Sequence, residues 1–245
     1  METLFDAACW QIVWKYRMTF VNGFLNTLST AAAGLVIAIL IGIVVGLCAT
    51  GESRALRWIA RAYVEFFQNT PVILQVCFLY YALAYSGIRT SVVTVGIIAL
   101  GIYTGAYMAE VIRAGITAIS TGQFDAAASQ GFDRLSTMRL IILPQTVKII
   151  LPPMVNQMVN LIKNTSCLYL VGGADLISLT YSFVTGEATG GAYGPAYLVS
   201  GALFFLICFP LSTLAGKWEQ HLKGRDKQQA AAIEQELKEE GVIPA

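Results

Sequence analysis

The chain has 245 residues and a formal net charge of +1, and hydrophobic residues make up 56% of it. Charged residues account for only 13%, about half of the ~25% that is usual in soluble domains. This composition excludes an intrinsically disordered chain and a disulfide-rich secreted domain, and so small a net charge gives no long-range attraction for nucleic acid. We therefore expect an integral membrane protein in contact with lipid, with no nucleic-acid partner.

Three parts of the chain differ in composition. Residues 1–20 contain Trp10 and Trp14 beside basic residues, which predicts an interfacial helix on the outer surface of the membrane. Residues 21–222 hold the long apolar segments and predict the transmembrane domain. Residues 223–245 mix both signs of charge with helix-forming side chains, and they predict a helical tail in the cytoplasm.

Long apolar segments with few charges predict the helices that cross the membrane, because a helix needs ~20 apolar residues to cross the ~30 Å hydrocarbon layer. We expect five spans, near residues 25–49, 68–87, 92–116, 149–171 and 196–216. Two spans carry small-residue pairs that allow close helix packing, namely Gly42 with Gly46 and Gly101 with Gly105. The predicted fold class is an all-α membrane protein with five transmembrane helices.

Lysine and arginine are unevenly distributed between the two sides of these spans. Most of the 16 basic residues follow the first, third and last spans. The positive-inside rule places those segments in the cytoplasm. With five spans, the N-terminus is then expected outside and the C-terminus in the cytoplasm.

The span at 149–171 carries polar side chains on one helical face, namely Asn156, Asn160, Lys163 and Asn164. Polar groups that face lipid are unfavourable, so this face is expected to point into the helix bundle or a water-filled path. Two interpretations stay open. The side chains line a substrate path, with Gln75 facing them from the second span, or they form hydrogen bonds between helices.

Residues 117–145 form a long segment between the third and fourth spans. Loops of this length are usually functional or disordered, and this one is too apolar and too varied for disorder. It reads DAAASQGFDRLSTMRLIILPQ from Asp125. The alanines predict a thin helix that can enter a groove on another protein. Gly131 predicts a tight turn to a second helix, because glycine adopts left-handed backbone angles at little steric cost.

The spacing within this segment resembles the coupling-loop signature of permease subunits in bacterial ABC importers. The residues that carry the resemblance are Asp125, Ala126, Ala127, Gly131, Ile141, Leu143 and Pro144. Three further segments resemble the polar amino-acid permease group, namely YVEFFQNTPVILQ, GIYTGAYMAEVIRAGI and LPPMVNQMVNLIKNTS. The resemblance therefore extends over roughly residues 20–217. Asp125 is a departure, because the family usually has glutamate there.

The resemblance implies a type I importer fold and a set of partners. In that family the loop docks in a groove on an ATP-hydrolysing subunit. The residues expected to form the docking helix, its bend and the following turn are Asp125, Ala126, Ala127, Gly131, Leu143 and Pro144. A second permease chain, identical or homologous, two ATPase subunits and an extracytoplasmic amino-acid-binding protein complete the transporter, in the bacterial inner membrane.

The chain itself is expected to bind no cofactor or metal and to catalyse no reaction. It has no Gly-x4-Gly-Lys-Ser/Thr phosphate loop, because its one Gly-Lys pair, Gly216-Lys217, is followed by Trp218. Its single histidine, His221, supports neither a histidine-based metal site nor a catalytic triad. ATP and Mg²⁺ are therefore expected to be used by the partner ATPase.

The expected function is ATP-driven import of polar L-amino acids. The resemblance around Leu151–Asn164 favours glutamate, aspartate or their amides, and Lys163 would favour an acidic substrate. A permease for basic amino acids such as arginine or histidine is the alternative within the family. An ion-gradient-driven secondary transporter is the alternative from another class, but those folds often show internal repeats with broken helices, and no such repeat is found.

Overall fold

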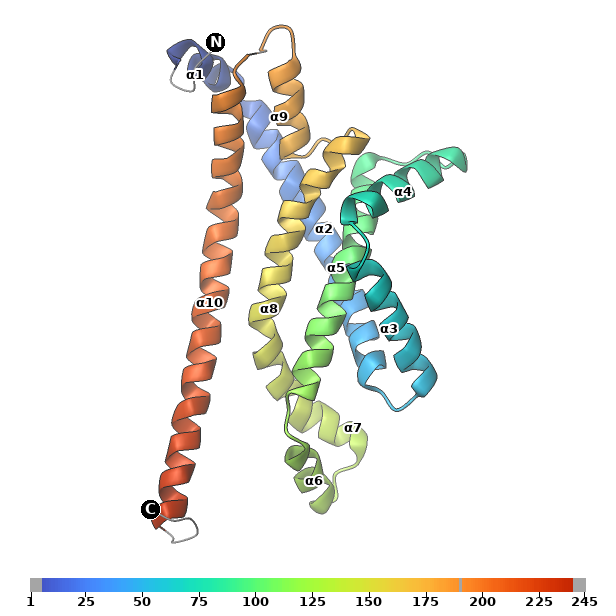
Figure 1. The fold of residues 1–245 in the computed structure, drawn as a ribbon, viewed down its shortest axis with the longest axis vertical. Helices are drawn as coiled ribbons and strands as arrows, with labels where there is room; N and C mark the ends of the chain where they lie inside the picture. The colour runs from blue at the N-terminus through green and yellow to red at the C-terminus, as the bar shows by residue number, and fades with distance from the viewer. Residues whose placement is uncertain (1–5, 190, 240–245) are drawn as a thin grey trace.

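The structure is a computed structural model that describes residues 6–189 and 191–239, with the side chains of all of these except 223 and 225–239. These residues form helices and connecting turns, with no strand among them. Figure 1 shows α1 and α9 at one end of the long axis, called the α9 end, and α6 and α7 toward the other, called the α6 end. The helices are α1 (Ala7–Lys15), α2 (Arg17–Thr50), α3 (Arg54–Gln68), α4 (Val72–Tyr85), α5 (Val92–Thr117), α6 (Thr121–Ser129), α7 (Arg134–Ser136), α8 (Leu143–Asn164), α9 (Leu176–Thr185) and α10 (Tyr193–Glu239).

Four helical segments are long and apolar enough to cross a membrane. They are Arg17–Thr50, Val92–Thr117, Arg134–Val171 and Tyr193–Leu222. The third of these joins α7 and α8 through a π-helical turn and ends in a 3₁₀ segment. Helices α3 and α4 form a further apolar pair, bent by 99° where they meet. Counted as one span, this pair brings the fold to the five spans expected, and the all-α class is confirmed.

The second span is bent, whereas the sequence predicted one uninterrupted segment over residues 68–87. Pro71 has no N–H group and disfavours helical backbone angles at Thr70 before it, so α3 ends before this point and α4 begins after it. Gln75 stabilises the break. Its side-chain amide donates hydrogen bonds to the carbonyl oxygens of Phe67 and Thr70 and to the Thr70 hydroxyl.

The centre of the fold is a close crossing of α2 and α5, the most extensive helix pair in the described chain. A Cβ atom added to Gly42 would lie 2.7 Å from the Cβ of Met108, and one added to Gly101 would lie 2.8 Å from the Cβ of Ile37. Only glycine lets two helices approach this closely. The packing predicted for the glycine pairs is confirmed for Gly42, Gly46, Gly101 and Gly105.

Alanine at Gly42 is expected to destabilise the fold, although alanine favours helices in general. Its methyl group would also lie 3.3 Å from the backbone nitrogen of Ala109, and overpacking of this kind costs ~1–3 kcal/mol. Gly201 on α10 provides the matched control, because nothing lies within 4 Å of its Cβ position. Thermal unfolding of Gly42→Ala and Gly201→Ala in detergent checks the prediction, and equal melting temperatures would contradict the close crossing.

A short helix that the sequence did not predict, α9, closes one end of the bundle. It has 10 residues, too few to be recognised as a span. Asp175 accepts hydrogen bonds from the first backbone amides of α9, and the Thr27 hydroxyl of α2 accepts one from the Leu176 amide at 3.0 Å. Phe20 and Phe183 pack beside them in a core that α1 also joins. These contacts hold α9 firmly against α2.

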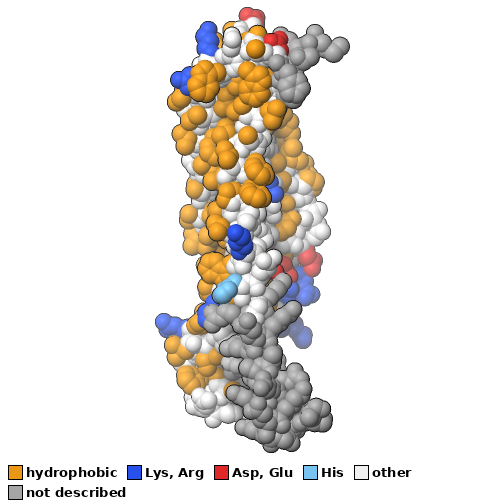
Figure 2. All heavy atoms as spheres, turned by 90° about the vertical axis from the view of Figure 1, so that its left-hand side faces the viewer, with side chains coloured by type: hydrophobic (Ala, Val, Ile, Leu, Met, Phe, Trp, Pro, Cys, Tyr) orange, Lys and Arg blue, Asp and Glu red, His pale blue; other side chains and the backbone are white. Residues whose placement is uncertain are grey.

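Helix α10 is continuous from Tyr193 to Glu239, so it passes without a break through residue 223, where the tail was expected to begin. Residues 240–245 of that tail lie outside the described residues. Figure 2 faces the α10 side of the molecule and shows hydrophobic side chains over much of that surface. Exposed members on α10 are Phe205, Leu206, Phe209 and Leu214. An apolar surface of this kind suits contact with lipid.

Candidate functional site

The α6 end carries a helical hairpin over residues 121–136, called the elbow, which consists of α6, the turn at Gly131 and α7. Gly131 has a φ of +81°. Its amide donates a hydrogen bond to the Ala128 carbonyl, and the Phe132 amide donates one to the Ala127 carbonyl. This pair of hydrogen bonds is the Schellman motif that ends many helices. In this motif the residue at the C′ position, here Gly131, has left-handed backbone angles. The tight turn predicted at Gly131 is present.

The elbow is packed onto the membrane helices. Phe124 of α6 lies against a cluster of isoleucines that includes Ile116 of α5 and Ile142 just before α8. Asp133 begins α7 by accepting a hydrogen bond from the Ser136 amide at 3.0 Å. Hydrogen bonds from the Ser136 side chain and backbone hold the pKa of Asp133 below its ordinary value. The carboxylate that caps α7 is therefore ionised at neutral pH.

The elbow is also continuous with α8. The helix runs from α7 through a π-helical turn, Thr137–Ile142, into α8 without a loop. The second half of the predicted segment at 117–145 is therefore part of the same helix as the fourth span. Leu143 and Pro144 form the first turn of α8, directly after the π-helical turn, where the regular hydrogen-bond ladder of the helix is already interrupted. Motion at the elbow would pass directly into α8.

The residues predicted to dock on an ATPase differ in exposure. Asp125 and Ala126 are exposed, whereas Ala127 is only 2% exposed. Pro144 is exposed and Leu143 is half-buried at the start of α8. A docking partner could therefore touch Asp125 and Ala126 directly, while Ala127 packs within the chain.

A cavity of about 200 Å³, called the polar cavity, lies between α5 and α8. Its lining residues are Tyr103, Thr104, Tyr107, Gln157, Asn160 and Asn164. All carry hydroxyl or carboxamide groups, and none is charged at neutral pH. The Tyr103 and Tyr107 hydroxyls share a hydrogen bond of 3.1 Å. The cavity therefore offers a ligand both donors and acceptors of hydrogen bonds.

Two of the five predicted path residues, Asn160 and Asn164, line the polar cavity. Asn156 and Lys163 are exposed, at helical spacing with Asn160. Gln75 does not line this cavity, and its amide nitrogen is hydrogen-bonded at the α3–α4 bend.

Four lining residues of the polar cavity were not predicted from the sequence: Tyr103, Thr104, Tyr107 and Gln157. The signal for the two tyrosines was their spacing of four, which places them on one face of α5. That signal is ambiguous, because aromatic side chains at helical spacing usually belong to a core. Only the approach of α8 shows that they face polar groups.

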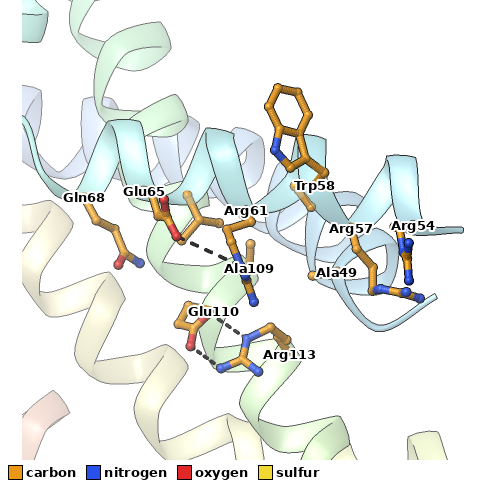
Figure 3. A pocket seen from close by; sticks show the side chains of 12 residues that line it. Ala49, Arg54, Arg57, Trp58, Arg61, Glu65, Gln68, Ala109, Glu110 and Arg113 are labelled. Carbon is orange, nitrogen blue, oxygen red and sulfur yellow. Dashed lines mark hydrogen bonds and ion pairs between the residues drawn. The ribbon is translucent and has the colours of Figure 1, made fainter. Parts of the chain in front are cut away.

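A larger cavity of about 600 Å³, called the charged cavity, lies between α3 and α5. Figure 3 shows Arg61 and Glu65 of α3 on one side of it, and Glu110 and Arg113 of α5 on the other. Arg113 donates two hydrogen bonds to the Glu110 carboxylate, at 2.5 and 2.8 Å. The Arg61 guanidinium lies 4.0 Å from the Glu65 carboxylate. Each ion pair is thus formed within one helix, and the two pairs face each other.

Residues 38–223 match the family described as "Binding-protein-dependent transport system inner membrane component". The chain belongs to this family. The permease is 35% identical over 204 residues to the "Probable glutamine ABC transporter permease protein GlnM" of Bacillus subtilis, covering 83% of this chain and 93% of that one. It is 40% identical over 158 residues to the "Putative glutamine transport system permease protein GlnP" of Rickettsia conorii, covering 64% and 72%. It is 31% identical over 206 residues to the "Arginine transport system permease protein ArtQ" of Bacillus subtilis, covering 84% and 93%.

Solved structures agree with this assignment. The permease matches a chain of the "Crystal structure of an amino acid ABC transporter with histidines" with a TM-score of 0.78 and 30% identity, covering 85% of this chain and 96% of that one. An inward-facing MetNI methionine ABC transporter shares the fold, with a TM-score of 0.67 at 18% identity, covering 82% and 96%. The predicted resemblance to ABC importer permeases is confirmed. The family is the non-catalytic membrane component of importers whose ATPase is a separate subunit, so an ion-gradient-driven transporter is excluded.

Proposed function

We propose that this permease forms half of the membrane channel of an importer for polar L-amino acids with a carboxyl or carboxamide side chain. Two permease chains, identical or homologous, pair around a central path. Two ATPase subunits bind the elbows and use ATP and Mg²⁺, and this chain itself binds no cofactor. An amino-acid-binding protein docks at the α9 end.

The polar cavity between α5 and α8 is the observation that carries this proposal. A carboxamide substrate presents two donors and an acceptor, and a carboxylate presents acceptors only. The amides of Gln157 and Asn160 and the hydroxyl of Tyr107 can satisfy either group. A site that hydrogen-bonds a polar substrate group rejects analogues that lack it. The two glutamine permeases among the relatives support the same substrate class.

A basic amino acid is the second candidate substrate, since ArtQ is an arginine permease. The side chains around the polar cavity favour it less. None of the lining residues is a carboxylate that could pair with a guanidinium or ammonium group. Lys163, exposed on the same helix, would repel a cationic side chain.

The distribution of basic residues supports an orientation in the bacterial inner membrane with the α6 end in the cytoplasm. Arg54, Arg57 and Arg61 lie on α3 near the loop that follows α2, and Arg134 lies in the elbow. Positive charge on one side of the spans is typical of the cytoplasmic side. In this orientation the exposed elbow points toward an ATPase, and the N-terminus and α9 lie outside.

ATP-driven uptake into proteoliposomes tests the proposed function. The complete transporter, with its ATPase and binding protein, is expected to accumulate labelled glutamine or glutamate. Excess unlabelled aspartate or asparagine should compete, whereas excess arginine should compete far more weakly. Accumulation of arginine alone would overturn the substrate class and leave the permease assignment intact. No ATP-driven accumulation of any amino acid would overturn the proposal as a whole.

Alanine at Lys163 is expected to lower the ratio of glutamate to arginine uptake about tenfold, equivalent to ~1.4 kcal/mol, because it removes the positive charge that precedes Asn164 on α8. Lys148→Ala is the matched control, since Lys148 is also an exposed lysine of α8, nearer the elbow. Initial uptake rates of the two amino acids in the same proteoliposomes provide the ratio. An unchanged ratio in Lys163→Ala would remove this residue from substrate selection.

A further inference from the structure

The two cavities follow one another along α5. Tyr103 and Tyr107 line the polar cavity, and Glu110 and Arg113 line the charged cavity. Tyr103, Tyr107 and Glu110 are spaced by four and three residues and so lie on one face of the helix. The charged cavity therefore follows the polar cavity along α5, on the side nearer the α6 end.

Four of the charged side chains that line the charged cavity form two ion pairs, and they are called the charge quartet: Arg61, Glu65, Glu110 and Arg113. Ionised groups in a membrane span are rare and usually functional, and Glu110 and Arg113 lie within a spanning helix. They are also accessible: the side chains of Arg113 and Glu110 are 41% and 42% exposed, and those of Arg61 and Glu65 are 79% and 67% exposed. Their remaining hydrogen-bonding positions are free to meet a solute.

The charges of the quartet alternate across the cavity. Arg61 of α3 acts electrostatically on the Glu110 carboxylate of α5, and Figure 3 shows these side chains extending toward the same space. Arg54 and Arg57 also line the cavity, and no carboxylate lies within ion-pair distance of either in the described part of the chain. A ligand that fits must therefore carry a negative group for the arginines and a positive group for Glu110.

We propose that the charge quartet is a second, transient binding site that holds the α-ammonium and α-carboxylate groups of the substrate on its way out of the polar cavity. Arg113 and Arg61 bind the α-carboxylate, which matches the forked guanidinium geometry, and Glu110 binds the α-ammonium group. A volume of about 600 Å³ lies within the ~300–1,000 Å³ range of small-molecule sites. The inference rests on the proposed function, because the ligand is an amino acid.

This site would bind the α-ammonium and α-carboxylate groups, which all amino acids share. The polar cavity recognises the side chain, and the charge quartet recognises the zwitterionic backbone. The competing interpretation is that each ion pair only stabilises its own helix, α3 or α5. The two interpretations differ in one measurable respect, since only a binding site distinguishes an intact zwitterion from analogues that lack one charge.

Protection of a cysteine in the cavity tests the proposal. Val64 lines the charged cavity and is half-buried, so Val64→Cys, in a chain whose five native cysteines are replaced, reports occupancy through its rate of thiol modification. The complete transporter is placed in nanodiscs, with the thiol reagent and glutamine added together. Glutamine should slow the modification. N-acetylglutamine, which lacks the ammonium group, and 4-aminobutanamide, which lacks the carboxylate, should need at least about tenfold higher concentrations.

Variants of the charge quartet show which side chain binds which charged group of the substrate. In Glu110→Gln, glutamine should protect as weakly as N-acetylglutamine. In Arg113→Gln, glutamine should protect as weakly as 4-aminobutanamide. Arg61→Gln, on the exposed side of α3, supplies a second test if Arg113→Gln fails to assemble. Arg89→Gln is the control, because Arg89 is exposed in the turn between α4 and α5, outside the cavity, and should change nothing.

The outcomes separate this inference from the proposed function. Equal protection by glutamine and both analogues, or none by glutamine, in a preparation with normal ATP-driven uptake would overturn the binding site alone. Absence of uptake by the unmodified transporter would overturn the proposed function first. Loss of the preference for the zwitterion in the quartet variants, with the preference kept in Arg89→Gln, would support the site.

Discussion

Valine at Gly131 is expected to reduce ATP-driven uptake at least about tenfold while the permease still inserts and assembles. The backbone φ of +81° at this position is unfavourable for a β-branched residue, and such a conformation costs ~1–3 kcal/mol. Crowding plays no part, because nothing lies within 4 Å of the Cβ position. The strain would open the turn, change the angle between α6 and α7, and misdirect the elbow that we propose docks on the ATPase.

Asparagine at Gly131 is the matched control, since asparagine tolerates left-handed backbone angles far better than valine. Uptake by Gly131→Asn should stay close to that of the unmodified permease. The measurements are uptake and the stimulation of ATP hydrolysis by loaded binding protein, made on the same proteoliposomes. If both variants transport normally with full stimulation, the angle of the elbow does not matter and the coupling proposal fails.

Lysine at Asp125 is expected to separate the permease from its ATPase. Asp125 is exposed on α6, so reversal of its charge should leave the fold intact. At a docked interface the same change replaces an attraction by a repulsion, and disrupting a charge pair there typically costs 2–5 kcal/mol, roughly 30-fold or more in affinity. Co-purification of the ATPase with the permease and ATP-driven uptake should fall together.

Two controls isolate the docking effect. Asp125→Glu keeps the charge and restores the residue usual in the family, so it should retain both activities. Glu187→Lys makes the same change of charge at an exposed position near the α9 end, far from the elbow, and should leave the ATPase attached. An ATPase that stays bound to Asp125→Lys, with unchanged uptake, would exclude this carboxylate from the docking surface.

Local properties of the chain made much of the fold predictable. Membrane insertion depends on a sufficient length of apolar residues, and the first, third and last spans follow from that length alone. Gly131 was recognisable because a left-handed residue at a helix end is nearly always glycine. The glycine pairs of α2 and α5 were recognisable because close crossings require small residues at a spacing of four.

Features that depend on two distant segments could not be predicted in this way. Helix α9 is too short to be recognised as a span and is held by Thr27, far away in the chain. From the sequence, the side-chain amide of Gln75 was a candidate to line a polar path. In the structure it instead stabilises the bend between α3 and α4 at Pro71. The tyrosines of the polar cavity and the charge quartet come to line cavities only because α8 and α3 pack beside α5.

Apolar length by itself determined that this protein is an all-helical membrane protein, and the motif around Gly131, by its resemblance to a known family, identified an importer permease. Each of these signals lies within one segment of the chain, where the energies of lipid transfer and backbone geometry act locally. The tertiary structure alone decided which polar residues meet. Cavities form between helices, and the residues that face them are selected by packing against partners far away in the sequence.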